Sequence, residues 1–526
     1  MDLQTRSSGV VLHITSLPGR HGVGDLGTEA HRFVDWLADA GQSVWQLLPV
    51  NPVGPGHSPY QCPSAFASSG LMVALQPLVQ RGWLPASSLQ AALQIQPAFD
   101  ARRVDYDAVI PWRWALLREA AAGFFARADA ADHKTFDAWC ATQSAWLREW
   151  ALFAALKDEH GGQPWWLWGE ALAGRDADAL ATARQRLART TAEHTFVQWC
   201  FDQQMAALRA HAQARGVRLM GDVPIFVAHD SVDVWARPDL YFLDAQHQPS
   251  VVAGVPPDGF GPDGQRWGNP LYRWDRMADD EYAWWVARVK RAFTHADILR
   301  IDHFRGFAGY WEVPASCPTA REGRWAAGPG KALFDAIESA LGKLPIVAED
   351  LGTITPDVTA LRDHFGFPGM RIVQEAFGGH EGGHEAAAGT HSFLPHNHVR
   401  ECLAYSSTHD SDTAQGWWAT ASDSTRACAS EYLQCTGAAV HWALIRAASQ
   451  SVACMALFPL QDVLGLDGTH RMNLPGTAQG NWCWRFDWPM LRPDAAARLL
   501  SISMASGRAA AGLLHTSMDS GRAPSG

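Results

Sequence analysis

The sequence predicts an α/β fold, a (β/α)8 TIM barrel that carries a helical insertion and long active-site loops. Short apolar runs alternate with helical patterns along most of the chain. Eight of these runs end in polar residues, near positions 10, 44, 218, 299, 346, 371, 404 and 454. Strands and helices alternating at this count favour a closed barrel over an open sheet. Because no Gly-x-Gly-x-x-Gly follows the first run, nucleotide binding has no support.

Length and composition agree with a decorated barrel. The chain has 526 residues, of which 47% are hydrophobic and 18% charged, which indicates a soluble globular protein with an ample core. The formal net charge of −11 argues against nucleic acid as a partner. No apolar run approaches the length of a membrane span, and the N-terminus shows no signal-peptide pattern. The nine cysteines are scattered without a Cys-x-x-Cys pair, so we expect a cytoplasmic protein without disulfides or zinc.

Residues 1–76 are predicted to form the first two strands of the barrel. A strand over 9–14, a helix over 28–40 and a strand over 43–48 make a right-handed βαβ start. The loop over 51–66 is rich in Pro, Gly and Ser. Since it is too long for an ordinary connection, we expect it to have a functional role.

Residues 77–195 are predicted to form a mainly helical insertion, because alanine, leucine, arginine and tryptophan recur there at helical spacing. The chain has 25 tryptophans, and flat indole rings stack well on sugar faces. Large cores and helix packing also use tryptophan, so composition does not decide between the two. Within the insertion we expect the tryptophans to pack between helices.

Residues 196–504 are predicted to complete the barrel. A helix over 196–216 leads to the strand near 218, and a long active-site loop region over 225–274 follows. The stretch over 505–526 is rich in Ala, Gly and Ser, which predicts a flexible tail.

Three carboxylates stand where predicted strands end. Asp302 closes the run Ile-Leu-Arg-Ile-Asp, Glu349 closes Ile-Val-Ala-Glu, and Asp410 follows Thr-His. Strand ends converge on one mouth of a barrel, so these residues can meet. Retaining glycosyl transfer needs two carboxyl groups about 5–5.5 Å apart. A structural ion pair and a metal site are the alternative interpretations.

Two of the carboxylates suit different roles. Arg300 lies two residues before Asp302, on the same face of the strand, and keeps that carboxylate ionised and oriented, as a nucleophile requires. Glu349 has apolar neighbours that raise the pKa of its carboxyl group, which suits an acid.

The third carboxylate is expected to act on the sugar ring. Asp410 can hold sugar hydroxyls and distort the ring towards the oxocarbenium geometry. His409 and His13 are expected to donate hydrogen bonds to hydroxyls.

Further motifs follow in a fixed order along nearly the whole chain outside residues 77–195. They are Leu12-His-Ile-Thr-Ser-Leu-Pro-Gly, Gly24-Asp-Leu-Gly, Ser58-Pro-Tyr-Gln, Gly221-Asp-Val-Pro-Ile, Asp230-Ser-Val-Asp-Val-Trp, Gly254-Val-Pro-Pro-Asp, Gly264-Gln-Arg-Trp-Gly-Asn-Pro-Leu-Tyr, Arg300-Ile-Asp-His-Phe-Arg-Gly, Ala348-Glu-Asp-Leu-Gly, Thr408-His-Asp, Arg471-Met-Asn-Leu-Pro-Gly and Gly480-Asn-Trp. This set resembles the 4-α-glucanotransferases of glycoside hydrolase family 77, the amylomaltases or disproportionating enzymes, which are relatives of the α-amylase clan.

The resemblance implies a double displacement through a covalent glycosyl-enzyme intermediate. Asp302 would be the nucleophile, Glu349 the acid/base and Asp410 the stabiliser of the transition state. It further implies α-glucan donors and acceptors as substrates, and neither a metal, a cofactor nor a C-terminal β-sandwich. The residues expected to bind substrate are Arg300, His409, Asp222, Tyr60, His13, Phe260, Gln265, Trp267 and Asn269.

Three positions depart from the family pattern. Gly259 stands where a tyrosine is frequent, Glu375 where an aromatic residue is common, and Ser411 where asparagine is usual. None of them removes one of the three carboxylates.

Two other functions fit the same residues. A retaining α-glucan hydrolase would use the same carboxylates, with water instead of a sugar 4-hydroxyl attacking the intermediate. A lid that excludes water favours transfer, and the loop through Phe260 and Trp267 is long enough to be one. A non-catalytic glucan-binding protein is the third interpretation, and the complete carboxylate set argues against it.

Overall fold

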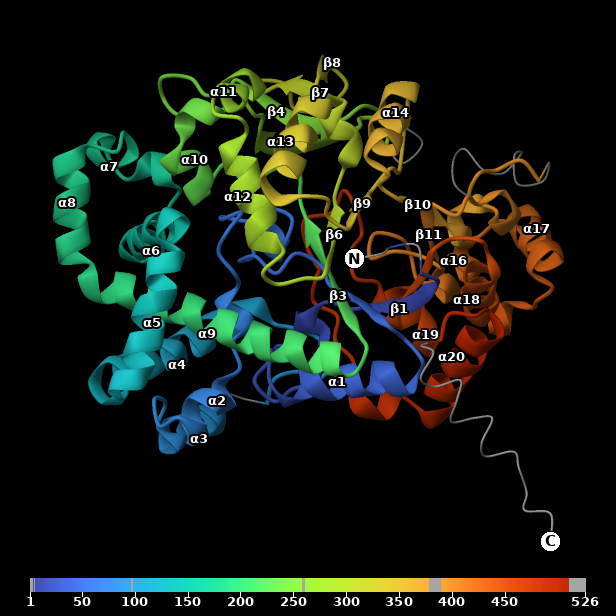
Figure 1. Cartoon of the computed structure of the whole chain (residues 1–526), viewed down its shortest axis with the longest axis horizontal. Helices are drawn as coiled ribbons and strands as arrows, with labels where there is room; N and C mark the ends of the chain where they lie inside the picture. The colour runs from blue at the N-terminus through green and yellow to red at the C-terminus, as the bar shows by residue number, and fades with distance from the viewer. Residues whose placement is uncertain (1–2, 4, 96–97, 258–260, 378–388, 510–526) are drawn as a thin grey trace, which may run out of the picture.

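The fold is a nearly closed barrel of eight parallel strands, as predicted (Figure 1). It is seen in a computed structural model that describes residues 3, 5–95, 98–257, 261–377 and 389–509. The strands neighbour one another in the order β10-β11-β12-β1-β2-β3-β6-β9, and all eight lie at or beside the predicted positions. They are β1 Ser7–Val11, β2 Val44–Gln46, β3 Arg218–Val223, β6 Ile298–Ile301, β9 Ile346–Ala348, β10 Gly369–Ile372, β11 Cys402–Tyr405 and β12 Met455–Pro459.

Most of the strands are buried along their whole length because both of their faces are covered. Every residue of β1, β2, β6, β9, β11 and β12 is buried. Between β1 and β2 the backbones approach so closely that a Cβ on Gly9 would lie 2.1 Å from the carbonyl oxygen of Val44. Only glycine at position 9 therefore permits the close approach of β1 to β2.

The two ends of the strand order also meet. Between β9 and β10 the N–H of Ala348 donates to the carbonyl of Pro368 at 2.9 Å.

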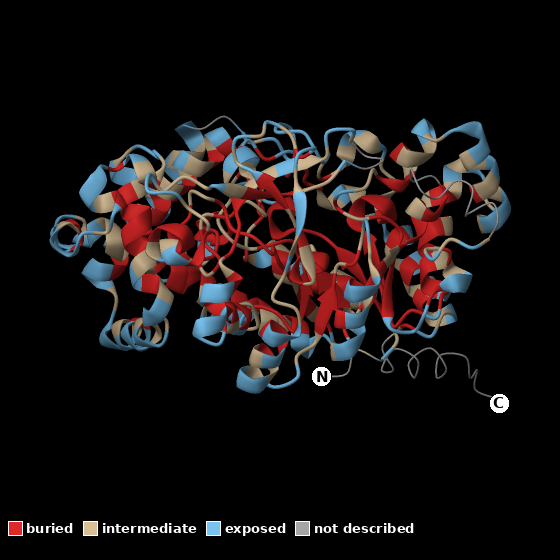
Figure 2. Cartoon of the chain, turned by 90° about the horizontal axis from the view of Figure 1, so that it is seen from above, coloured by how far each residue is buried: buried red, intermediate tan, exposed pale blue. Residues whose placement is uncertain are grey.

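Helices surround the barrel, and the buried residues gather in its centre (Figure 2). Helix α1 packs on α9 and α20, α12 packs on α13, and α18 packs on β11 and β12. These helices around the strands are α1 Thr28–Asp39, α9 Ala188–Ala214, α12 Ala283–Ala292, α13 Lys331–Leu341, α14 Pro356–Phe365, α18 Val440–Gln450 and α20 Pro493–Ala505. After β12 the described chain forms helices α19 and α20, with α19 at Leu460–Leu464.

The described part of the region predicted as an insertion is mainly helical. Its helices are α2 Leu75–Gln80, α3 Ala86–Ile95, α4 Tyr106–Arg127, α5 Ala130–Thr142, α6 Ser144–Glu159, α7 Glu170–Ala173 and α8 Ala177–Arg186. Both predicted boundaries of this region fall within helices, 76/77 inside α2 and 195/196 inside α9. Helix α9 contains neither Gly nor Pro, so nothing interrupts it between the insertion and the barrel.

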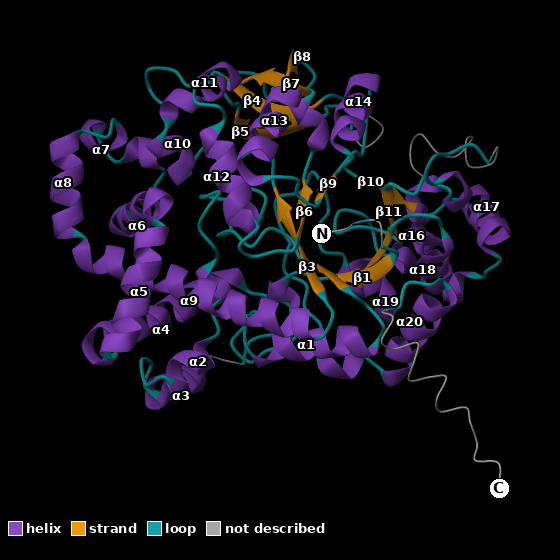
Figure 3. Ribbon diagram, in the orientation of Figure 1, coloured by secondary structure: helices purple, strands orange, loops and turns teal. Residues whose placement is uncertain are grey.

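A second, smaller sheet lies above the barrel in the order β5-β4-β7-β8 (Figure 3). Two of its strands, β4 and β5, and helix α10 lie in the region over 225–274 that was predicted as a loop, and helix α11 begins at the last residue of that region. Strand β5 is half-exposed and contains Gly and Pro, so it lacks the alternation that marks a strand in sequence. Strand β4, Val-Val-Ala-Gly-Val, is a short apolar run that the prediction of a loop overlooked. The elements are β4 Val251–Val255, β5 Gln265–Pro270, β7 Gly309–Pro314, β8 Arg324–Ala327, α10 Val232–Ala236 and α11 Trp274–Asp279.

The end of the described chain is anchored beneath the barrel. Arg508, which the sequence places in a flexible tail over 505–526, is 1% exposed. Its guanidinium donates to the carbonyl oxygens of Ser7, Ser449, Ser451 and Ala453 at 2.7–3.1 Å. The predicted start of the tail at residue 505 is therefore too early, because one arginine in an Ala/Gly/Ser-rich stretch makes all of these contacts.

All 25 tryptophans lie in the described part of the chain, where twelve are buried and twelve are partly buried. Trp325 on β8 is the one exposed tryptophan, with 44% of its surface accessible. Trp150, Trp165 and Trp168 of the insertion are buried between helices. Among the described residues, no helix is both long and apolar enough to cross a membrane.

Candidate active site

The three carboxylates predicted at strand ends meet at one mouth of the barrel. Asp302 follows β6, Glu349 follows β9, and Asp410 lies in the loop between β11 and the helix α16 (Ala414–Thr420), which precedes α17 (Asp423–Leu433). Arg300 on β6 and Asp222 on β3 stand beside them. Hydrogen bonds and close contacts connect Arg300, Asp222 and Asp302 with Asp410 through Tyr60 and His409, whereas the side chain of Glu349 accepts from backbone N–H groups.

Arg300 holds two carboxylates at once. Its Nη1 donates to Asp222 Oδ1 and Oδ2, both at 2.8 Å, and to Asp302 Oδ1 at 2.9 Å. Its side chain is 4% exposed and that of Asp222 is fully buried. The pair of Arg300 with Asp302 is the one that their two-residue spacing predicts. Asp302 itself remains 26% exposed, so its free oxygen faces the mouth.

The ionisation of Asp302 is a balance of opposing effects. Burial raises the pKa of its carboxyl group, Arg300 lowers it, and the charges of Asp222 and Asp410 raise it again. The result is a pKa of about 6. The expectation that Arg300 alone would keep this carboxylate ionised is therefore incomplete, because burial outweighs the arginine. The ionised form still predominates at neutral pH.

The pKa of the Glu349 carboxyl group is raised further than that of Asp302. Burial raises the pKa of its carboxyl group to about 8, with Asp302 and Asp350 adding to the rise, although Arg300 opposes it. Its Oε2 accepts the N–H of His303 at 2.7 Å, and its Oε1 accepts the N–H of Leu351 at 3.2 Å. His303 takes a left-handed conformation with φ 49°, which is uncommon outside glycine and aims its N–H at Glu349. Glu349 is protonated at neutral pH.

The surroundings of Asp410 favour its ionised form. Burial opposes its ionisation, but His409 and Asn473 hold the pKa of its carboxyl group well below the usual range. His409 Nε2 lies 3.3 Å from Oδ2, and Asn473 Nδ2 donates to Oδ1 at 2.6 Å. Arg471 donates to the carbonyl oxygen of Asp410 at 2.9 Å. The side chain is 48% exposed, so an ionised carboxylate faces the mouth.

Tyr60 connects Asp410 to the arginine network. Its hydroxyl donates to Asp222 Oδ2 at 2.8 Å and lies 2.9 Å from His409 Nε2. A hydroxyl has one hydrogen to give, so His409 Nε2–H donates to the tyrosine oxygen. The two rings are parallel with centroids 5.3 Å apart. Tyr60, which was expected to bind substrate, is therefore also part of the network of carboxylates.

The remaining predicted residues lie around this network with different surroundings. His13 is 4% exposed, and burial, with His409 nearby, lowers the pKa of its imidazole to about 3, which makes it neutral. Trp267 Nε1 donates to Gln265 Oε1 at 3.1 Å, and its ring meets His303 edge-on at 4.8 Å. Phe260 lies outside the described residues.

Asn269 stabilises the loop after β2 through hydrogen bonds. It is 3% exposed, and its Nδ2 donates to Gln61 Oε1 at 3.1 Å and to the carbonyl of Val227 at 2.8 Å. Gln61 Nε2 in turn donates to Asn269 Oδ1 at 2.9 Å and to the carbonyl of Trp267 at 3.3 Å. This reciprocal amide pair joins the loop after β2 to strand β5. Both donor hydrogens of Asn269 are used within the protein.

Sequence reasoning assigned no role to Asn473, Arg471 or Gln61. All three lie in motifs that carried the family resemblance, Arg471-Met-Asn-Leu-Pro-Gly and Ser58-Pro-Tyr-Gln. The motifs were the available signal, but nothing in their spacing shows that Arg471 and Asn473 contact Asp410 or that Gln61 contacts Asn269.

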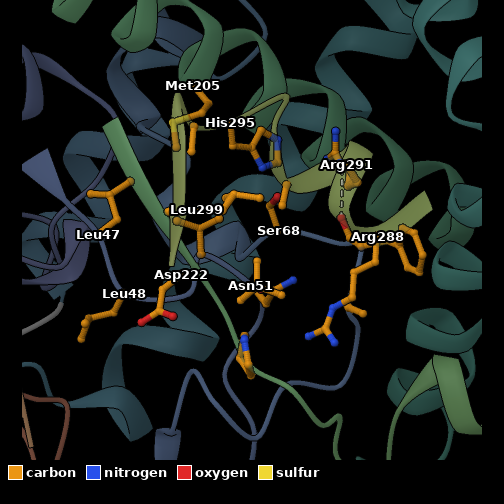
Figure 4. A pocket seen from close by; sticks show the side chains of 18 residues that line it. Leu47, Leu48, Asn51, Ser68, Met205, Asp222, Arg288, Arg291, His295 and Leu299 are labelled. Atoms are coloured by element: carbon orange, nitrogen blue, oxygen red, sulfur yellow. Dashed lines mark hydrogen bonds between the residues drawn. The ribbon is translucent and has the colours of Figure 1, made fainter. Parts of the chain in front are cut away.

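Two hollows lie beside the network. A pocket of about 420 Å³ is lined by Arg471, Asn481 and Trp484 and adjoins the loop that carries Asp410. A cavity of about 40 Å³ lies behind Asp222, against α9 and α12, and Figure 4 shows Met205, Leu299 and His295 in its lining. Asp302, Glu349 and Asp410 do not line this cavity, so it is separate from the mouth.

The arrangement suits acid and nucleophilic chemistry by carboxyl groups. It places a protonated carboxyl group, an ionised one beside an arginine, and a second ionised one at a single mouth. Two carboxyl groups whose pKa values are separated by their surroundings are the pattern of an acid and a nucleophile. Among the described residues, no group of three His, Cys, Asp or Glu side chains is arranged to hold a metal ion.

Comparison with known proteins gives consistent results. A family model described as 4-alpha-glucanotransferase matches residues 12–491. The 4-alpha-glucanotransferase of Thermus thermophilus is 46% identical over 511 residues, which cover 96% of this chain and 99% of that protein. The one from a Synechocystis strain is 45% identical, covering 96% of this chain and 99% of that protein. The structure of an amylomaltase from Streptococcus agalactiae in complex with acarbose superposes with a TM-score of 0.91 at 34% identity, covering 96% of this chain and all of that one.

Proposed function

The chain belongs to the 4-alpha-glucanotransferase family, and from this premise we propose that Asp302, Glu349 and Asp410 carry out its reaction. The enzyme transfers a segment of a 1,4-α-glucan to the 4-hydroxyl of an acceptor glucan or of glucose.

In the first step the ionised carboxylate of Asp302 attacks C1 of the donor sugar. The bond from C1 to the leaving oxygen breaks, and Glu349 gives its proton to that oxygen. A glycosyl ester on Asp302 and a shortened glucan result. The ionised Asp410 lies beside the reacting sugar, where its negative charge stabilises the oxocarbenium-like transition state.

In the second step the 4-hydroxyl of an acceptor loses its proton to Glu349, and its oxygen attacks C1. The ester bond breaks, Asp302 is ionised again, and Glu349 regains its proton. Two inversions at C1 leave the α-configuration unchanged. The observation that carries this proposal is the different surroundings of the two carboxyl groups. Arg300 donates to Asp302 at 2.9 Å and favours its ionised form, whereas burial raises the pKa of Glu349 and favours its protonated form.

The remaining groups support substrate binding in this scheme. Tyr60, His409 and the ring of Trp267 lie around the three carboxylates and would contact sugar rings and hydroxyls. Asp222 and Arg300 hold Asp302 in place. The free cysteines and the net charge of −11 support a reducing cytoplasm and a protein that does not bind nucleic acid.

Maltotriose as the sole substrate separates transfer from hydrolysis. A transferase converts it into glucose together with maltopentaose and longer chains, so the number of glycosidic bonds stays constant. Chromatography of the products over time, with a parallel assay of reducing ends, measures both quantities. A steady rise in reducing ends without longer chains would show that water is the acceptor, and would identify a retaining hydrolase instead.

The activity is expected to follow a bell-shaped dependence on pH. As the pH falls through about 6, Asp302 becomes protonated and the nucleophile is lost. As the pH rises through about 8, Glu349 loses the proton that the leaving oxygen needs. Since kcat/KM reports the free enzyme, its profile on maltotriose should show both limbs. Because the two groups interact, each apparent pKa in the profile belongs to the pair of carboxyl groups and not to one residue. An activity that stays constant from below pH 6 to above pH 8 would contradict the assignment.

A further inference from the structure

The loop that carries Asp410 is connected to the end of strand β10 by a chain of hydrogen bonds. The N–H of Asp410 donates to Thr408 Oγ1 at 3.3 Å, and Thr408 Oγ1 lies 3.1 Å from Ser411 Oγ. Ser411 Oγ donates to Glu375 Oε1 at 3.2 Å. Glu375 lies in the single helical turn Val373–Ala376 that directly follows β10. The chain therefore begins at the backbone of Asp410 and ends on a fourth carboxyl group.

The groups in this chain fix the direction of each hydrogen bond. Thr408 Oγ1 accepts from a backbone N–H, so its own hydrogen is available for Ser411 Oγ. Ser411 donates its hydrogen to Glu375 Oε1, which in the ionised form of Glu375 can only accept. Ser411 Oγ also accepts the N–H of Thr408 at 3.2 Å, which uses its full capacity of two acceptances and one donation. Hydrogen bonds aligned in one direction strengthen one another.

A second contact from the same turn holds the other side of the loop. Gln374 Nε2 donates to the carbonyl oxygen of Asp412 at 3.1 Å. The segment from Thr408 to Asp412 is thus fixed from both sides by two consecutive residues of one turn. Glu375 and Ser411 are also two of the positions at which this sequence departs from the family pattern, and here they contact each other.

We propose that Glu375 is a positioning residue for the transfer reaction, which acts through Ser411 and Thr408 to hold Asp410 at the mouth. The inference rests on the proposed role of Asp410. Among the described residues, no hydrogen bond joins Glu375 to Asp302 or Glu349, so its effect passes through the loop.

The electrostatic surroundings of Glu375 agree with a positioning role. Burial raises the pKa of the Glu375 carboxyl group to about 7, Ser411 lowers it, and Asp410 raises it. Glu375 is therefore close enough to Asp410 for the two negative charges to repel each other. The contact with Ser411 favours the ionised form that gives the hydrogen-bonded chain its direction.

The test compares kcat and KM on maltotriose for four variants. Glu375→Ala and Ser411→Ala should each lower kcat about tenfold, the effect of losing one hydrogen bond to a charged group, while KM stays within about twofold. Glu375→Gln keeps an acceptor for Ser411 and should retain most of the wild-type kcat. The double variant Glu375→Ala/Ser411→Ala should be no slower than either single variant, because both changes break the same chain.

A matched control is present in the helical region. Ser88 Oγ donates to Glu119 Oε1 at 2.6 Å, which is the same pair of residue types far from the mouth, so Glu119→Ala should leave kcat unchanged. Circular dichroism and thermal melting report folding. If Glu375→Ala does not fold, Ser411→Ala and Glu375→Gln still test the chain.

Asp410→Ala, measured in parallel, separates this inference from the proposed function. If Asp410→Ala is inactive while Glu375→Ala and Ser411→Ala retain the wild-type kcat, the positioning role is wrong. The same conclusion follows if only KM changes, if Glu375→Gln is as slow as Glu375→Ala, or if the two losses multiply in the double variant. If Asp410→Ala is fully active, the proposed role of Asp410 itself is wrong.

Discussion

Replacing Asp302 with asparagine is expected to lower kcat on maltotriose by about four orders of magnitude or more, the size of effect seen when a nucleophile is removed. An amide of nearly the same shape does not form the glycosyl ester. Arg300 keeps both of its bonds to Asp222, so the local structure should persist. Glucan binding, measured by calorimetry with a maltooligosaccharide, should remain close to that of the wild type.

The chain contains a matched control for this substitution. Arg237 and Asp239 have the same two-residue spacing as Arg300 and Asp302, and their side chains pair at 2.8 Å on the surface. Asp239→Asn should therefore leave turnover unchanged. An Asp302→Asn variant that retains more than about one per cent of the activity, with deamidation excluded by mass spectrometry, would remove Asp302 from the role of nucleophile.

Replacing Glu349 with alanine should affect donors according to how much their leaving groups need a proton. Turnover of maltotriose should fall by about two to four orders of magnitude, the usual contribution of a general acid and base. α-Maltotriosyl fluoride should still react in the first step, because fluoride leaves without protonation. The second step lacks its base, so the glycosyl-enzyme should accumulate.

Mass spectrometry of the intact variant and of its peptides should then show one maltotriosyl group attached to Asp302. Azide attacks without giving up a proton, so adding it should restore turnover and release an α-glycosyl azide. If maltotriose and the fluoride lose activity equally, Glu349 is not the proton donor. A label on a residue other than Asp302 would instead reassign the nucleophile.

The barrel strands and the three carboxylates could be predicted from sequence because their signals are local. A buried parallel strand is a continuous apolar run, and the residue that ends it faces the mouth wherever the barrel closes. Strand β5, Gln-Arg-Trp-Gly-Asn-Pro, has neither feature, since it is half-exposed and belongs to a separate sheet. It therefore looked like part of a loop.

The groups that tune the carboxylates were not predictable in the same way. Asn473 and Gln61 act on residues far from them in sequence, and only the fold brings them together. The pKa of Asp302 depends on the difference between burial and the charge of Arg300, and a spacing of two residues reveals only the second effect. The sequence could indicate which side chains meet, but not which of two opposing effects is larger.

The anchoring of Arg508 has a consequence for how the protein is made. Strand β1 pairs with β12, and the guanidinium of Arg508 bonds to the carbonyls of Ser7 and of residues just before β12. During synthesis β1 can pair early with β2, but its other neighbour, β12, becomes available only after all the other barrel strands have been translated. The ring of strands cannot close earlier, and its open edges need protection from aggregation for that time. Catalytic competence should thus arise late, after translation of the barrel has finished.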